Sequence, residues 1–302
     1  TSSHRQRVIS TNKRVASNHL SLKDKRMDVD ELDKTLKLFN GFTQNEEKRR
    51  RICNYIKDKK RISIFAYGSL LWNPIGFYDE FIPNSILNDY KKGFYCEDFI
   101  YRGTSCFSGL TMGLEFELNQ CVHGALFVAF ETNLVQFLKS FIQRESPRNY
   151  EGLSMDIYEY DFVEVYLPDK DQFEYSITCI VNKKSVFYLN NRLSIDDQAK
   201  KIGQAYGTNG TNFQYLNKLK LIYHKLNIND SFSAQFEDLY EKILEFRSNL
   251  TLNQHQWLQI YDQLQSLEEN QPNQICLYDY FSTLQLFNET NFPMEQSSSS
   301  SS

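Results

Sequence analysis

Strand patterns run almost without interruption from Arg61 to about Leu189, and this stretch constrains the fold more than any other part of the chain. It opens with a short apolar run, Ile62 to Ala66, which is typical of a buried strand and leads into a turn containing Gly68. Further strands are predicted over 91–101, 110–118, 122–130, 157–167, 173–182 and 185–189. So many strands in a row, with few helices between them, are consistent with a mixed α+β fold.

Turns and one helix interrupt these strands. Turn-forming residues predict breaks at Pro83-Asn84, Asn119-Gln120 and Pro168-Asp169. One helix is expected from about Leu134 to Ile142, because its apolar residues recur on a single helical face.

The segments on either side of this stretch divide the chain into four parts. Residues 1–60 are expected to form a basic arm, flexible over 1–27 and folded into one or two surface helices from Val29 to about Lys59. Residues 61–226 form the main domain. Residues 227–296 form a helical extension, and 297–302 a poly-serine tail.

Helical periodicity predicts the remaining helices of the chain. In the main domain these cover 194–206, with Ser194 as the N-cap, and about 212–225. In the extension, 231–248 and 252–268 are amphipathic, and 275–287 is apolar enough to pack against another part of the protein.

Charge is distributed unevenly along the chain, although the net charge is only −4. Residues 1–60 carry 16 basic and 8 acidic residues, a net charge of +8, whereas the remaining 18 basic and 30 acidic residues give −12. A basic head can bind RNA or acidic lipid, but its interleaved acidic residues favour a solvated tail. The acidic body argues against a nucleic-acid binder, and no protein partner of the extensions can be named.

Composition also excludes several other classes of protein. No run approaches the ~20 apolar residues that a membrane helix needs, and no apolar run follows the basic N-terminus as in a secretory signal. The six cysteines form no C-x-x-C pair, so neither a metal nor a redox motif is supported. We therefore expect a cytosolic protein with reduced thiols.

The turn Tyr67-Gly68-Ser69-Leu70 is the first candidate for chemistry. A strand that enters such a turn can point successive backbone N–H groups into one concavity, where they bind a carboxylate or a developing oxyanion. On physical grounds alone an ordinary turn remains the alternative.

Glu145 is the second candidate, because it sits just past the predicted helix end. A partly desolvated carboxylate in such a place has a raised pKa and can act as a general base near neutral pH. The alternative is a solvated glutamate paired with Arg144 or Arg148.

Two further segments contain possible substrate contacts. Arg102, which follows a strand, could bind a substrate carboxylate through two hydrogen bonds or form a structural ion pair. The segment from Gly203 to Leu216 lacks the lysine and the spacing of phosphate-binding loops, so it reads as a break between two helices. Tyr215 in this segment could face a site or fill the core.

Five motifs, taken in order, resemble those of the ChaC-like γ-glutamylcyclotransferases. They cover roughly residues 61–226. They are Tyr67-Gly68-Ser69-Leu70-Leu71-Trp72, Tyr101-Arg102-Gly103-Thr104 with Gly109-Leu110, Cys121-Val122-His123-Gly124-Ala125, Phe137-Leu138 with Arg144-Glu145 and Tyr150, and Ala205-Tyr206-Gly207 through Asn212 to Tyr215-Leu216.

This resemblance implies a mostly antiparallel, barrel-like sheet with packed helices, and a specific reaction. The family cleaves the γ-glutamyl bond of glutathione without water and releases 5-oxoproline and cysteinylglycine. The substrate's own α-amine attacks, so neither a nucleophilic side chain nor a metal or cofactor is implied. Glu145 matches the acid/base residue, and Tyr67 to Leu70 match the loop that holds the glutamyl group. Arg102, Tyr150 and Tyr215 match positions near the substrate.

Three departures from the family's motifs leave the substrate open. Ile100-Tyr101, His123 and Ser146-Pro147 replace the residues that the family carries at these places. The same cyclisation of another γ-glutamyl amine or dipeptide, or a catalytically weak binding or regulatory protein on the same fold, remains an alternative.

Overall fold

A computed structural model describes residues 29–104, 106–146 and 155–250 of this chain. Several predictions fall outside these residues: the flexible arm over 1–27, Tyr150, the helices over 252–268 and 275–287, and the poly-serine tail. No helix in the described ranges is both long and apolar enough to cross a membrane.

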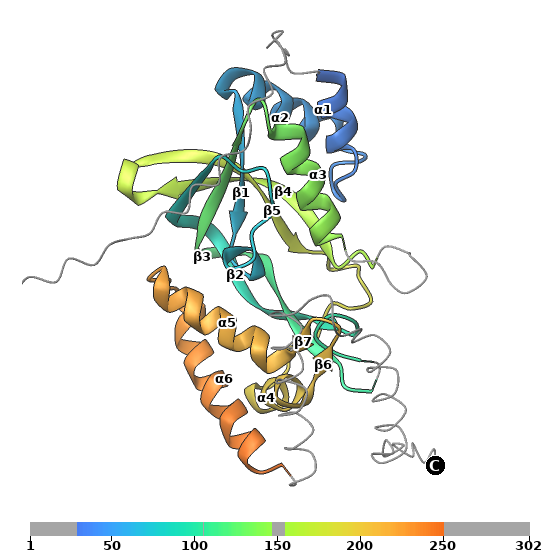
Figure 1. The fold of residues 1–302 in the computed structure, drawn as a ribbon, viewed down its shortest axis with the longest axis vertical. Coiled ribbons are helices and arrows are strands. Elements are labelled where there is room, and N and C mark those ends of the chain that lie inside the picture. Colours follow the sequence, from blue (N-terminus) through green and yellow to red (C-terminus); the bar gives the residue numbers. More distant parts are fainter. Residues whose placement is uncertain (1–28, 105, 147–154, 251–302) are drawn as a thin grey trace, which may run out of the picture.

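Five strands form a closed barrel at the centre of the protein (Figure 1). They are β1 (Arg61–Ala66), β2 (Glu80–Asp98), β3 (Gly109–Phe130), β4 (Tyr158–Leu167) and β5 (Gln172–Val181), in the order β1-β3-β2-β4-β5. Neighbouring strands are antiparallel, except that β1 and β5 close the barrel through a short parallel pairing. The predicted α+β fold with a mostly antiparallel, barrel-like sheet is confirmed.

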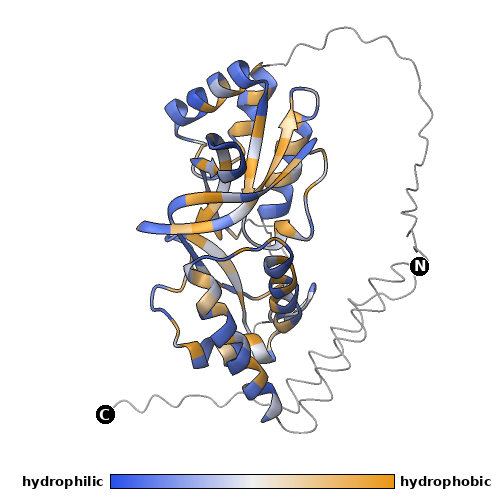
Figure 2. Ribbon diagram, turned by 90° about the vertical axis from the view of Figure 1, so that its left-hand side faces the viewer, coloured by the Kyte–Doolittle hydropathy of each residue, from blue (hydrophilic) through white to orange (hydrophobic). Residues whose placement is uncertain are grey.

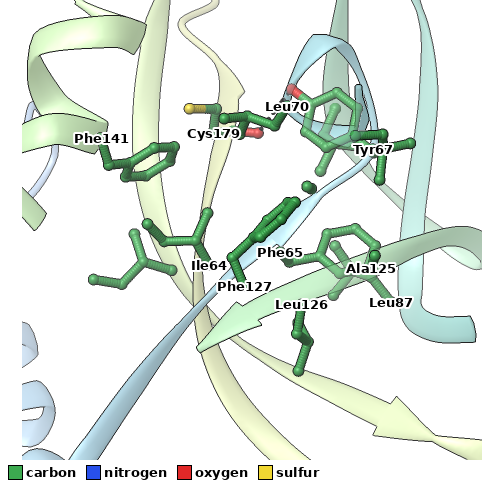
Figure 3. Close-up of a cluster of buried hydrophobic side chains, with 14 of the residues drawn as sticks. Ile64, Phe65, Tyr67, Leu70, Leu87, Ala125, Leu126, Phe127, Phe141 and Cys179 are labelled. Atoms are coloured by element: carbon green, nitrogen blue, oxygen red, sulfur yellow. Dashed lines mark hydrogen bonds between the residues drawn. The ribbon is translucent and has the colours of Figure 1, made fainter. Parts of the chain in front are cut away.

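Burial of β1 on both of its faces accounts for the apolar run after Arg61. Ile62, Ile64, Phe65 and Ala66 of β1 are almost completely buried. Strand β1 pairs with β3 in register from Arg61 opposite Phe130 to Ala66 opposite Ala125. Figure 3 shows Ile64 and Phe65 packed among side chains from several strands, and Figure 2 shows apolar residues gathered on the barrel strands.

Two predicted turns are wrong, because the chain continues through them as strand. Pro83 and Asn84 lie inside β2, where the register with β3 shifts between Ile82 and Ser85. Asn119 lies inside β3, so the two strands predicted over 110–118 and 122–130 are one long strand. Such bulges tolerate proline and residues with positive φ, and they bend a strand without ending it.

The region over 185–189 was predicted as a strand but consists mainly of turns. Only Tyr188 makes an isolated bridge, to Cys96 of β2. The predicted turn at Pro168-Asp169 is confirmed, because a short 3-10 helix, η2 (Pro168–Lys170), joins β4 to β5.

Three helices pack together at one end of the barrel (Figure 1). They are α1 (Val29–Leu36), α2 (Glu46–Lys59) and α3 (Leu134–Glu145). Leu32 and Leu36 of α1 are fully buried, and Phe141 of α3 packs edge-on against Tyr160 of β4. The helices predicted from Val29 and from Leu134 are therefore confirmed, and both contribute to the core.

Three more helices lie at the other end of the molecule (Figure 1). They are α4 (Ile195–Gln204), α5 (Asn212–Lys225) and α6 (Ser231–Ser248), and they confirm three predicted helices. Ser194 caps α4 as expected, accepting a hydrogen bond from the N–H of Asp197. A small hairpin of β6 (Tyr206–Gly207) and β7 (Gly210–Thr211) forms the predicted break between α4 and α5.

Candidate active site

One cavity of about 290 Å³ opens between the barrel and the two helical groups. The residues that line it come from the loop after β1, the end of β2, β3, α3, β4, β5 and α5. Seven of the eight residues singled out in the sequence line this one cavity: Tyr67, Gly68, Ser69, Leu70, Arg102, Glu145 and Tyr215. The eighth, Tyr150, lies outside the described residues.

The loop from Tyr67 to Leu70 leaves β1 and turns at once into the 3-10 helix η1 (Ser69–Leu71). The carbonyl groups of Gly68 and Ser69 are used within the turn: Leu71 N–H donates to Gly68 O at 3.0 Å, and Asn73 N–H donates to Ser69 O at 3.0 Å. In the described part of the chain, no acceptor is seen for the backbone N–H groups of Gly68, Ser69 and Leu70. These N–H groups at the start of the turn are suited to binding an anionic oxygen.

Glu145 is the last residue of α3 and does not lie just past its end as predicted, because the helix continues for three residues beyond Ile142. Its side chain is only 16% exposed. The apolar face of α3 packs on the barrel through Phe137, Leu138 and Phe141, and this packing carries Glu145 to the cavity. Glu145 is therefore not the solvated surface residue of the alternative reading.

Arg144 links Glu145 to the loop after β1. Its Nε donates to Glu145 Oε1 at 2.8 Å, one Nη donates to Ser69 Oγ at 3.0 Å, and the other donates to Asn73 O. Glu145 Oε2 accepts no hydrogen bond from the described residues. One carboxylate oxygen is thus fixed by a guanidinium, and the other is available in the cavity.

Two opposing effects act on the acidity of Glu145. Burial raises the pKa of the Glu145 carboxyl above its ordinary value, and the charge and hydrogen bond of Arg144 partly offset this rise. A carboxylate with a raised pKa is a stronger base than one in water, and it can also return a proton. The combination suits a general acid/base residue.

Arg102 and Tyr215 form another part of the cavity wall. The Arg102 guanidinium lies 5.1 Å from the centre of the Tyr215 ring and donates to Asn209 O. Beside them, buried Asp98 accepts hydrogen bonds from the N–H groups of Ile100 and Tyr101. Tyr215 is only 4% exposed and still lines the cavity. It therefore both fills the core and faces the site.

Several residues that line the cavity were not predicted from the sequence as site residues. Arg144 stood in the Arg-Glu motif and was treated only as a possible ion-pair partner. Tyr158 and Cys179 come from β4 and β5, where their alternation reads as ordinary core. Tyr158 donates to Met112 O at 2.8 Å, and burial strongly raises the pKa of the Cys179 thiol, which disfavours the reactive thiolate. No spacing signal distinguishes such residues from other core positions.

Of the residues that depart from the family's motifs, some line the cavity and others do not. Tyr101 lines it, whereas His123 does not. The backbone N–H of His123 donates to Asp230 Oδ2 at 2.9 Å, behind the site. Ser146 Oγ lies 3.1 Å from Tyr160 Oη and helps to fix the end of α3. Among the described residues, no three His, Cys, Asp or Glu side chains gather where they could hold a metal ion.

Two comparisons of the sequence with known proteins match most of the main domain. The sequence model of the ChaC-like protein family matches residues 62–245. Gamma-glutamylcyclotransferase 2-3 of Arabidopsis thaliana is 26% identical over 200 residues, covering 63% of this chain and 94% of that protein.

Solved structures support the same fold. A crystal structure of a yeast γ-glutamyl cyclotransferase specific to glutathione superimposes with a TM-score of 0.53 at 17% identity, covering 62% of this chain and 97% of that one. A second structure of that yeast enzyme gives a TM-score of 0.50 at 16% identity, covering 62% of this chain and 99% of that one.

Proposed function

Because the chain belongs to the ChaC-like protein family, we propose that it is a γ-glutamylcyclotransferase that converts glutathione to 5-oxoproline and cysteinylglycine. The observation that carries this proposal is the placement of the buried Glu145 carboxylate and the Tyr67–Leu70 loop in the wall of one cavity. The substrate is a small molecule. Its cleavage requires a base and a site for the glutamyl group, and this wall offers both.

The reaction begins with removal of a proton. The α-amine of a γ-glutamyl compound is an ammonium ion at neutral pH and cannot attack until it loses one proton. Glu145 is the base, and its Oε2 is the oxygen that accepts the proton, because Oε1 is held by Arg144. Burial of the carboxyl favours this transfer, since it raises the pKa of Glu145.

Ring closure follows within the substrate. The free amine forms a bond to the γ-carbonyl carbon, which becomes tetrahedral, and the bond from that carbon to the cysteine nitrogen then breaks. Glu145 returns its proton to the departing nitrogen, and the ring nitrogen gives up its remaining extra proton as the bond breaks. The products are a neutral lactam and cysteinylglycine, whose new amino group carries that proton as an ammonium ion, and no water is consumed. Holding the amine against the carbonyl supplies much of the rate, as in other intramolecular reactions.

The cavity walls orient the substrate for this step. The N–H groups of Gly68, Ser69 and Leu70 bind the glutamyl group, and the Arg102 guanidinium binds the second carboxylate at the far end of a tripeptide. Tyr215 forms the wall beneath Arg102. Tyr150 remains a predicted substrate contact, and a cytosolic location belongs to the same proposal.

An assay with purified protein and millimolar glutathione tests this function. We expect 5-oxoproline and cysteinylglycine from the wild type, and a loss of ~10²-fold or more in Glu145→Gln. A control variant, Glu117→Gln, changes an exposed glutamate of β3 and should keep full activity.

The outcomes separate the alternative substrates. Turnover of other γ-glutamyl amines or dipeptides without turnover of glutathione would support the cyclisation reaction but contradict glutathione as the substrate. No product from any γ-glutamyl compound would contradict the enzyme and favour a binding protein on this fold.

A further inference from the structure

Tyr223 makes a hydrogen bond to the substrate loop from behind. This residue lies on α5, is 5% exposed and does not line the cavity. Its hydroxyl donates to the carbonyl oxygen of Tyr67 at 2.8 Å and lies 3.3 Å from Met112 Sδ. A buried hydroxyl is therefore aimed at the backbone of the loop.

The geometry of a peptide unit gives this contact its significance. In a trans peptide the carbonyl group of one residue and the N–H group of the next point in opposite directions. The peptide from Tyr67 to Gly68 is trans, and its carbonyl points toward Tyr223, which does not line the cavity. The N–H of Gly68 consequently points toward the cavity.

Helix α6 holds the Tyr223 ring in place. Lys92 Nζ lies 4.1 Å from the centre of this ring, and the ring of Phe236 on α6 lies 5.8 Å away. Lys92 in turn forms a fully buried ion pair with Asp230, 2.8 Å long, and Asp230 is the N-cap of α6. A continuous set of contacts thus runs from the start of α6 through Tyr223 to the substrate loop.

We propose that Tyr223 is a positioning residue, which holds the Tyr67–Gly68 peptide so that the Gly68 N–H faces the substrate. Helix α6 is then part of the active-site framework, because it supports the tyrosine that orients this peptide. The inference rests on the proposed function, in which the N–H groups of the loop bind the glutamyl group. It assigns a role to a residue that never touches the substrate.

The test is Tyr223→Phe in the full chain, because this change removes one oxygen and keeps the ring. Without its donor, the Tyr67 carbonyl is free to rotate, and the loop binds the glutamyl group less well. We expect the KM for glutathione to rise about tenfold while kcat changes by less than about threefold, the pattern of a lost binding interaction. Tyr55→Phe is the control, since its hydroxyl donates to Glu174 at 2.8 Å, remote from the cavity.

A binding measurement separates this proposal from the proposed function. Calorimetric titration of glutathione into Glu145→Gln and into the double variant with Tyr223→Phe should show an affinity lower by about tenfold in the double variant. An inactive wild type would contradict the reaction but leave this comparison valid. A KM and an affinity within twofold of their reference values would overturn the positioning role, as would an equal effect of Tyr55→Phe.

A second variant keeps the hydroxyl and loosens its support. Phe236→Leu removes the ring that packs against Tyr223, so the KM should rise in the same direction by a smaller factor. A KM unchanged by Phe236→Leu would contradict the role of α6 in the framework.

Discussion

Two buried ion pairs, Lys92–Asp230 and Arg144–Glu145, lie on either side of the Tyr67–Leu70 loop. They differ in what surrounds their carboxylates. Asp230 and Lys92 are essentially inaccessible, at 1% and 0% side-chain exposure, whereas Glu145 and Arg144 are 16% and 22% exposed. Asp230 also accepts hydrogen bonds from the N–H groups of His123 and Phe232. Glu145 has Arg144 alone among the described residues.

This difference shows how one kind of pair serves two purposes. Both oxygens of Asp230 are occupied, so its charge is used to fix β2, β3 and the start of α6 to one another. Glu145 has one oxygen fixed and one facing a cavity, so its charge can be exchanged for a proton. A buried carboxylate becomes reactive when part of its hydrogen-bonding capacity is left for the substrate.

The comparison predicts the largest effect on stability at Asp230. Asp230→Asn leaves the buried ammonium of Lys92 without a counter-charge, which should cost about 3–5 kcal/mol of unfolding free energy in urea denaturation. The control is Asp196→Asn, which breaks an exposed pair with Lys242 and should cost less than ~1 kcal/mol. Equal losses in the two variants would show that the buried pair has no special role.

At the other pair, Arg144→Ala should mainly affect activity. The loop loses its link to Glu145, and kcat/KM should fall by as much as ~10²-fold, because small displacements of reacting groups are costly. Arg144 also opposes the rise in the pKa of Glu145, so its removal should move the acidic limb of the pH–activity profile to higher pH.

Arg144→Lys separates these two effects. It keeps the positive charge and should hold the acidic limb near its wild-type position, while the lost guanidinium geometry keeps kcat/KM low. A profile that does not move in Arg144→Ala would contradict the assignment of Glu145 as the titrating base.

Glu145→Gln should change stability in the opposite sense to Asp230→Asn. Because the pKa of Glu145 is raised by folding, its protonated form favours the folded state below the pKa of the unfolded chain, and this contribution is lost as pH rises through the folded pKa. The neutral variant should therefore be more stable than the wild type near pH 7 and approach it near pH 4. Urea denaturation of both proteins at pH 7 and at pH 4 measures this difference in stability. A variant that is less stable than the wild type at pH 7 would argue against the raised pKa of Glu145.

The smallest effect on the free energy of unfolding is expected for a substitution at Gly68. A Cβ added there would lie 3.7 Å from Tyr215 Oη, an ordinary contact, so Gly68→Ala should cost less than ~1 kcal/mol. At Gly109 the same atom would lie 2.3 Å from Arg102 O, so Gly109→Ala should cost about 1–3 kcal/mol. Thermal unfolding compares the two, and a large loss in Gly68→Ala would mean that the loop has no space for the methyl group.

Local patterns predicted the elements that place the site. The apolar run of β1, the single face of α3 and the N-cap of α4 are each encoded within a few residues, and the structure has all three. The bulges at Pro83 and Asn119 escaped prediction, because turn-forming residues look the same whether a partner strand continues past them or not.

The partnerships behind the cavity could not be predicted for a similar reason. Nothing in the sequence tells that Lys92 is fully buried while Lys91 is partly exposed, since the burial of Lys92 depends on Asp230, which lies far along the chain. Likewise, the hydroxyl of Tyr223 finds its acceptor 156 positions away. Local periodicity indicates that a residue is apolar or buried, but it does not identify the distant residue that makes a polar group useful.

The short parallel pairing of β1 with β5 has a consequence for the order of folding. It joins Ser63 to Ser176 and Ile64 to Ile177, residues separated by 113 positions, and closing so long a loop is entropically costly. Just beyond this pairing, Tyr67 Oη donates to Cys179 O at 3.1 Å, so two walls of the cavity meet only when the barrel closes. An intermediate with an open barrel would have no substrate pocket, and glutathione added during refolding would select the closed chains and stabilise them by mass action.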